Sequence, residues 1–225
     1  MQDINNAAEK DLVEECTDLM CDETSTCDMC TTTSVDDSDA LTEKIFNERC
    51  VFEGKIFNVN RLDVELPDGR HAVRDVVRHP GAVGVIALTN NGKIVLVRQY
   101  RAALDRITLE IPAGKLELGE DPLLAAHREL TEETGFVAKN MAFLTSIVSS
   151  VGFCDERISL YLATELSFEG ADPDDDEFIN VDLLEVGDLI DAVLDGKIED
   201  AKTITGALLC DAIAHRLDSE IPNEQ

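Results

Sequence analysis

The residues best suited to chemistry in this sequence are glutamates within residues 114–136. Glu129, Glu132 and Glu133 recur at helical spacing, so a helix would gather them on one face, which we expect to point outward. Carboxylates this crowded repel one another unless a positive charge lies among them. Arg128 can supply part of that charge, and Mg²⁺, which prefers carboxylate oxygens, can supply the rest. A solvated acidic face without function is the alternative interpretation.

A short amphipathic helix must position these carboxylates. Asp121 lies where an N-cap belongs, and Pro122 lies at the first helical position, where its missing N–H has no consequence. Gly135 marks the end of the helix, because a helix often ends on a residue that accepts a left-handed backbone. Three apolar side chains recur at helical spacing and are expected to face a core: Leu123, Ala126 and Leu130.

The spacing around this helix resembles the Nudix box, G-x5-E-x7-R-E-U-x-E-E-x-G-U, in which U is a bulky apolar residue. Every fixed position of the box is matched, by Gly114, Glu120, Arg128, Glu129, Leu130, Glu132, Glu133, Gly135 and Phe136. The resemblance implies an α/β fold, an α/β/α sandwich with a mixed sheet. It also implies hydrolysis of a nucleoside diphosphate linked to another group, with Mg²⁺ as cofactor and Mn²⁺ as the alternative.

Strings outside the box narrow the resemblance to one branch of that family. Over about residues 46–215 the chain is similar to the ADP-ribose pyrophosphatases (ADP-sugar pyrophosphatases), through RDVVRHPGAVGV, LVRQYR, LEIPAGKLE, GFCDE and DGKIEDAKT. The implied reaction splits the diphosphate bond of ADP-ribose or a related ADP-sugar into AMP and a sugar phosphate. A homodimer is also implied, in which the leading β-subdomain is exchanged and helps to build the neighbour's substrate site.

The same resemblance assigns roles to individual residues. The metal is expected to be held by the Ala113 carbonyl, Glu129 and Glu133, with Glu132 binding a further metal or orienting the attacking water. The residues expected to act in catalysis are Glu132, Glu133 and, on an acidic loop, Glu177. The residues expected to contact the substrate are Arg74, Arg101, Gly152 and Glu156. Glu120 and Arg128 are expected to brace the loop and the helix.

Some of these assignments have alternatives. Asp174, Asp175 and Asp176 compete with Glu177 as the loop carboxylate, and the loop could also be a solvated turn. Arg74 and Arg101 could each form a surface salt bridge instead of binding substrate. Val151 stands where the branch usually has proline, so the loop lacks a fixed φ and gains an N–H. That substitution leaves hydrolysis intact but weakens the case for ADP-ribose as the substrate, so hydrolysis of another nucleotide sugar or dinucleotide is an alternative. Binding of ADP-ribose without catalysis is a separate alternative, against which the complete box argues.

Composition excludes several other classes of protein. The 225 residues carry a formal net charge of −28, which argues against binding to nucleic acid or to an anionic membrane. The N-terminal residues are acidic and lack the apolar region of a secretory signal, and no apolar run is long enough to span a bilayer. Seven cysteines are an odd number, and together with the missing signal they predict a cytoplasmic protein with reduced thiols.

The chain divides into four segments by composition. Residues 1–44 form an acidic segment without aromatic residues, which we expect to be disordered, with a short helix near residues 11–20. Cys27 and Cys30 form a CxxC in it, for which a metal or redox site is the alternative interpretation. Residues 45–79 are predicted to form an antiparallel β-subdomain, residues 80–217 the Nudix domain, and residues 218–225 a C-terminal tail.

Alternation and turn signals predict the elements within these segments. Turns are expected at the Pro-Asp-Gly of residues 67–69 and the Asn-Asn-Gly of residues 90–92. Strands are expected at residues 82–88, 93–100, 107–114, 141–149, 158–165 and 179–184. Two further helices are expected at residues 186–194 and 203–217.

Overall fold

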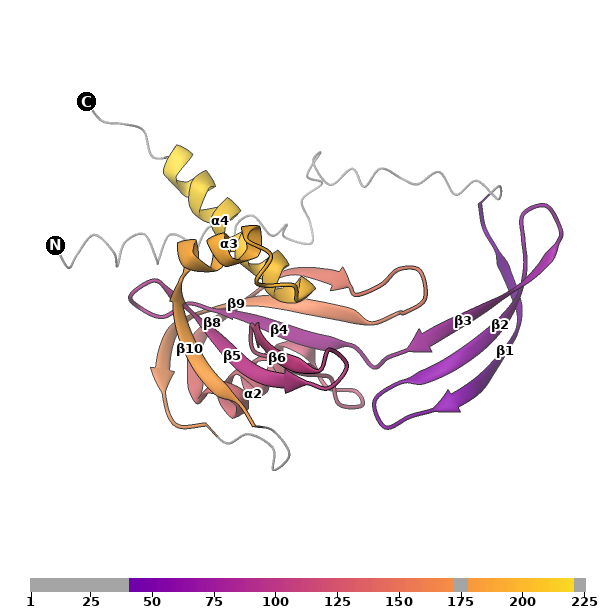
Figure 1. Ribbon diagram of the computed structural model, residues 1–225, viewed down its shortest axis with the longest axis horizontal. Helices are drawn as coiled ribbons and strands as arrows, with labels where there is room; N and C mark the ends of the chain where they lie inside the picture. The colour runs from indigo at the N-terminus through magenta and orange to yellow at the C-terminus, as the bar shows by residue number, and fades with distance from the viewer. Residues whose placement is uncertain (1–40, 172–177, 221–225) are drawn as a thin grey trace. The chain divides into compact units, whose positions relative to one another are not determined.

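The computed structural model describes residues 41–171 and 178–220, with side chains to residue 216 (Figure 1). These residues form two compact units, one of residues 41–81 with 148–157 and one of the remainder. The predicted helix at residues 11–20, the CxxC and the acidic-loop candidates Asp174, Asp175, Asp176 and Glu177 lie outside the described residues.

The first unit is built on a three-stranded antiparallel sheet. Its strands follow in the order β1 (Lys44–Glu53), β2 (Asn58–Glu65) and β3 (His71–Arg78). The predicted turn between β2 and β3 is confirmed, because Gly69 has φ 81° and donates to the carbonyl of Leu66. Residues 148–157, which the sequence boundaries assign to the following domain, are grouped with this sheet. Their Phe153 carbonyl accepts from the N–H of Val77 on β3, at 2.7 Å.

The second unit contains a mixed sheet and an antiparallel sheet. The mixed sheet has the order β7 (Ala113–Lys115), β4 (Ala82–Ala87), β9 (Arg157–Phe168) and β8 (Phe136–Val148), with β4 parallel to β9. The antiparallel sheet has the order β10 (Asn180–Glu185), β5 (Lys93–Arg101) and β6 (Arg106–Glu110). The predicted turn before β5 is confirmed, because Gly92 has φ 77° and donates to the Thr89 carbonyl.

Helices cover both faces of these sheets, as Figure 1 shows. Alternate side chains of β4 separate into two apolar cores, as the strand's period of two requires. Val83 and Val85 pack with α2 (Pro122–Thr134). Ile86 packs with α3 (Val186–Leu194) and α4 (Ala201–Glu220). The predicted α/β/α sandwich with a mixed sheet is therefore confirmed.

Both ends of α2 are as predicted. Asp121 Oδ1 accepts from the N–H of Leu123 at 2.8 Å, and Gly135, with φ 74°, donates to the Thr131 carbonyl at 2.8 Å. The predicted bounds of α3 are also correct. Helix α4 begins two residues earlier than predicted, because the preceding Asp200 caps it by accepting from the N–H of Thr203 at 3.0 Å.

The prediction of which face of α2 is buried was wrong in two respects. Leu123 is 40% exposed, and Ala125 is buried in its place. Glu129 and Glu133 do not point outward but are 9% and 4% exposed. The reason is geometric: residues 129, 130 and 133 follow residue 126 by three, four and seven positions, so all three lie on the helix face of Ala126. The carboxylates therefore lie beside the core rather than opposite it.

No helix within residues 41–171 and 178–220 is both long enough and apolar enough to cross a membrane.

Candidate active site

Arg128 lies at the centre of a cluster of carboxylates on α2. Its Nε and Nη2 donate to the two oxygens of Glu120 at 2.9 and 3.0 Å. Its Nη1 donates to Glu129 at 2.8 Å and to Glu132 at 2.9 Å. The hydrogen bonds to Glu120 contribute most to raising the pKa of Arg128, with the bonds to Glu129 and Glu132 and the charge of Glu129, although burial opposes this. One permanently charged guanidinium thus joins three carboxylates that would otherwise repel one another.

The carboxylate of Glu129 lies directly against the backbone of β7. A Cβ atom at Gly114 would stand 2.0 Å from the Glu129 carboxylate carbon and 2.0 Å from its Oε1. No side chain can share this space, so the glycine of the box is needed here for room. The φ of Gly114 lies outside the left-handed region, so backbone conformation is not the reason.

Glu133 is hydrogen-bonded to Ala113, the residue before Gly114 on β7. Its Oε2 accepts from the N–H of Ala113 at 2.9 Å. The structure therefore brings together Ala113, Glu129 and Glu133, three of the four predicted metal ligands. Glu132, the fourth, is half-buried and shares Arg128 with Glu129.

The donor set at this position fits a hard divalent cation. Its side-chain donors are the carboxylate oxygens of Glu129 and Glu133, which Mg²⁺ prefers over nitrogen or sulfur. Gly114 keeps the space beside Glu129 free of a side chain. In the part of the chain that the structure describes, no three His, Cys, Asp or Glu side chains converge closely enough to hold a metal. The guanidinium of Arg128 instead lies between Glu120, Glu129 and Glu132.

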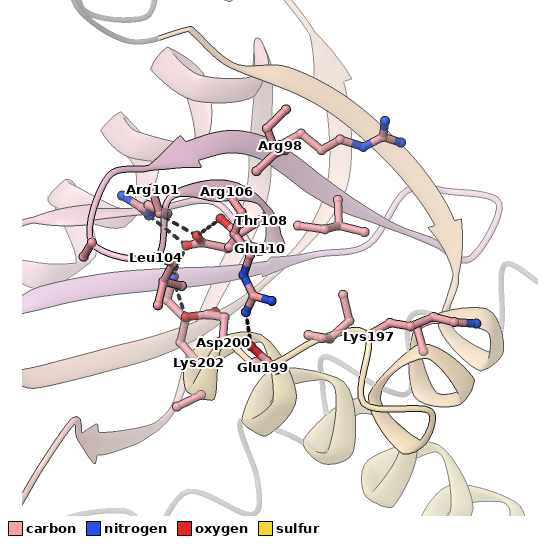
Figure 2. A pocket seen from close by; sticks show the side chains of 16 residues that line it. Arg98, Arg101, Leu104, Arg106, Thr108, Glu110, Lys197, Glu199, Asp200 and Lys202 are labelled. Atoms are coloured by element: carbon pink, nitrogen blue, oxygen red, sulfur yellow. Dashed lines mark hydrogen bonds and ion pairs between the residues drawn. The ribbon is translucent and has the colours of Figure 1, made fainter.

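A second charged cluster lies at an open pocket of about 760 Å³ (Figure 2). Its centre is Glu110 at the end of β6, which is only 3% exposed. Arg101 binds it through two parallel hydrogen bonds, Nε to Oε1 at 2.8 Å and Nη2 to Oε2 at 2.7 Å. Lys202 Nζ donates to Oε2, and Thr108 Oγ1 donates to Oε1 at 2.6 Å.

These donors decide the ionisation of Glu110. Burial alone would raise its pKa, but the hydrogen bonds from Arg101, the charge of Lys202 and the remaining bonds outweigh burial. Together they lower the pKa of Glu110 from the ordinary value of 4.5 to about 2. Glu110 is therefore ionised at neutral pH in spite of its burial.

We expect the Glu110 cluster to make the free energy of unfolding depend on pH between about pH 4.5 and pH 2. Because the folded pKa is the lower one, its contribution is complete above about pH 4.5 and is lost as pH falls to about 2. Glu110→Gln removes the charge at every pH. The difference in unfolding free energy between parent and variant, measured by urea denaturation, should therefore be largest near pH 6 and mostly gone at pH 2. A difference that does not change with pH would contradict this assignment.

Three of the predicted substrate residues, Arg74, Gly152 and Glu156, belong to the first unit. Arg74 Nη2 donates to Glu43 at 2.5 Å, so the alternative of a surface salt bridge is realised for it. Gly152 is exposed and Glu156 is half-buried in residues 148–157. Asp155, which had no predicted role, fastens this segment to the end of β3 by accepting from Arg78 Nη1 at 3.0 Å.

Sequence reasoning also missed the roles of Glu110, Lys202 and Thr203. The strings LEIPAGKLE and DGKIEDAKT contain them, and both strings contributed to the family resemblance. Nothing in either string shows that the two meet in space.

Comparison with known proteins identifies the family to which the chain belongs. A NUDIX domain model matches residues 78–206. An ADP-ribose pyrophosphatase of Bacillus subtilis (strain 168) is 45% identical over 73% of this chain and 90% of its own. A methanol dehydrogenase activator of Bacillus methanolicus is 46% identical over 72% and 89%. A crystal structure of an ADP compounds hydrolase, 22% identical, has a TM-score of 0.70 and covers 79% of this chain and 97% of its own.

The likeness to the solved structure supports the fold, an α/β/α sandwich with a mixed sheet. The match over residues 78–206 then shows that the chain belongs to the Nudix family.

Proposed function

We propose that the protein hydrolyses the diphosphate bond of ADP-ribose or a related ADP-sugar, giving AMP and a sugar phosphate. The observation that carries the proposal is the complete box, whose Glu129 and Glu133 are buried beside Ala113. The substrate class is supported by the 45% identical relative, which is named an ADP-ribose pyrophosphatase and is covered over 90% of its length.

The mechanism assigns each side chain a task. Ala113, Glu129 and Glu133, with Glu132 as a further ligand, would hold Mg²⁺ or Mn²⁺, which when bound neutralises the diphosphate and activates water. Arg128 keeps Glu120, Glu129 and Glu132 in place through four hydrogen bonds. Arg101 supplies positive charge for the phosphate oxygens.

Water forms a new bond to one phosphorus as the bridging oxygen departs with the other phosphate. Glu177 is the proposed acceptor of the proton that the water releases. The proposed substrate contacts of Arg74, Gly152 and Glu156 belong to this same reaction.

The other proposed properties concern the assembly and its location. We propose a homodimer that exchanges the β-subdomain, supported by apolar side chains of β1 that are exposed in the single chain, Ile45, Phe46, Val51 and Phe52. Sedimentation equilibrium of the full chain tests it, since a particle of one 24.7 kDa chain would contradict it. A cytoplasmic location is supported by the described cysteines, Cys50, Cys154 and Cys210, which are thiols and not disulfides.

A second candidate function is hydrolysis of another nucleotide sugar or dinucleotide. Two relatives of nearly equal identity have different names, so similarity alone leaves the substrate open. Val151 is a second reason to test other substrates. It stands where the branch usually has proline, and it is 89% exposed.

A substrate panel decides between the two candidates. Purified protein with Mg²⁺ is given ADP-ribose, ADP-glucose, GDP-mannose, NADH and a diadenosine polyphosphate, and released nucleotide is measured by chromatography. We expect kcat/KM for ADP-ribose to exceed the others at least tenfold. Preference for another compound would establish the second candidate. Tight binding of ADP-ribose with no hydrolysis of any compound would establish a binding module.

A further inference from the structure

Arg101 uses only one edge of its guanidinium to bind Glu110. Nε and Nη2 are both engaged, whereas Nη1 donates to no other described residue. The hydrogen bonds that Arg101 donates to Glu110 are the main cause of the raised pKa of Arg101, and the charge of Glu133 also contributes. The guanidinium therefore lies within electrostatic reach of a proposed metal ligand, with one donor edge available for an anion.

Lys202 also binds Glu110, through an oxygen that it shares with Arg101. Its side chain is buried in the first turn of α4, and its Nζ donates to Glu110 Oε2 and to Asp200 Oδ1. Each Glu110 oxygen is thus shared between Arg101 and one other donor, which is Thr108 for Oε1 and Lys202 for Oε2. Figure 2 shows these bonds converging on one carboxylate.

The start of α4 is itself fixed. Asp200 Oδ2 accepts from the N–H of Thr203 at 3.0 Å and from its hydroxyl at 2.5 Å. Thr203 Oγ1 in turn accepts from the N–H of Ile111, the residue after Glu110, at 2.9 Å. The support of Glu110 is therefore a rigid helix terminus rather than a mobile side chain at the surface.

We propose that Lys202 and Glu110 are positioning residues, which hold the Nη1 edge of Arg101 toward the diphosphate of the substrate. This inference rests on the proposed function, in which Arg101 binds the phosphate oxygens. A carboxylate held by two further donors cannot follow Arg101 when its guanidinium rotates, so the arginine keeps one orientation. Pre-positioning of this kind strengthens binding because less side-chain freedom is lost on association.

The test is a double-mutant cycle in the full chain with ADP-ribose as substrate. Lys202→Met should raise KM about tenfold and change kcat by less than threefold, because Arg101 binds substrate and transition state alike. Lys202→Arg should recover most of the KM. Lys202→Met added to Arg101→Ala should raise KM no further, since the residue that it positions is already absent.

Lys197→Met is the matched control. Lys197 lines the same pocket but is exposed and pairs with Asp195 at 2.8 Å, outside the cluster. We expect it to keep the parent KM. If Lys202→Met fails to fold, Thr108→Val removes the other donor to Glu110 and should raise KM severalfold in the same Arg101-dependent way.

Independent effects of Lys202→Met and Arg101→Ala on KM would overturn the positioning role. The substrate panel tests the proposed function separately from the positioning role. If the proposed function is wrong, the parent protein will cleave a different compound of the panel. The same cycle would be measured with that substrate, and independent effects there would again overturn the role.

Discussion

Glu133→Gln should lower kcat for hydrolysis of ADP-ribose about 10³-fold, on the order of 4 kcal/mol of transition-state stabilisation. The substitution keeps the shape of the side chain and an oxygen that can accept from the N–H of Ala113. It removes the negative charge that a divalent cation requires. Steady-state kinetics with saturating Mg²⁺ measures the loss.

Glu169→Gln is the control for this change, since Glu169 is exposed on the same unit and has no proposed role. It should keep the parent kcat. Because Glu133 is 4% exposed, the Tm of its variant must also be measured. A folded Glu133→Gln protein with activity within a factor of a few of the parent would refute the assignment of Glu133 as a metal ligand.

Gly114→Ala should separate activity from stability. The added Cβ would stand 2.0 Å from the Glu129 carboxylate, and that carboxylate is the end of a flexible side chain that can turn away. We therefore expect Tm to change by less than about 4 °C, corresponding to roughly 1 kcal/mol. The displaced carboxylate should nevertheless lower kcat about 10²-fold, a typical effect of an ångström-scale misplacement in an active site.

Gly187→Ala provides the comparison, because a Cβ atom at Gly187 in α3 would meet nothing within 4 Å. It should leave both kcat and Tm near the parent values. Loss of activity in Gly114→Ala that is fully explained by unfolding would show that the glycine serves the fold and not the placement of Glu129.

The local features of the fold were predictable because each depends on neighbouring residues. The caps of α2 at Asp121 and Gly135 follow from side-chain hydrogen bonding and from left-handed backbone preference. The turns at Gly69 and Gly92 follow from the same preference. The box itself is a local pattern, so its residues were found without knowledge of the tertiary structure.

The burial of Glu129 and Glu133 was not predicted, because charged residues on a helix are normally assigned to the solvent side. That rule fails where carboxylates have hydrogen-bond donors beside the core, here the peptide N–H of Ala113 and the guanidinium of Arg128. The error therefore falls at the candidate site itself, where local rules are most often broken in favour of function.

The cluster around Glu110 could not be predicted for a different reason. Glu110 and Lys202 are 92 positions apart in sequence, and neither lies in a pattern that points to the other. The chain has 66 charged residues, so the sequence does not indicate which of them pairs with Glu110. Only the packing of α4 against the second unit's sheets brings the two together.

The hydrogen bond from Ile111 to Thr203 has a consequence for how the protein is made. Its two residues are 92 positions apart, so a ribosome adding 5 to 20 residues per second needs roughly 5 to 20 s between them. The box ends at Phe136, so its last residue is added 67 positions before Thr203. The segment between Glu110 and Ala113 still lacks both Lys202 and Thr203. A newly synthesised molecule therefore contains all the carboxylates of the box before it contains the residues that hold Glu110 and Ile111.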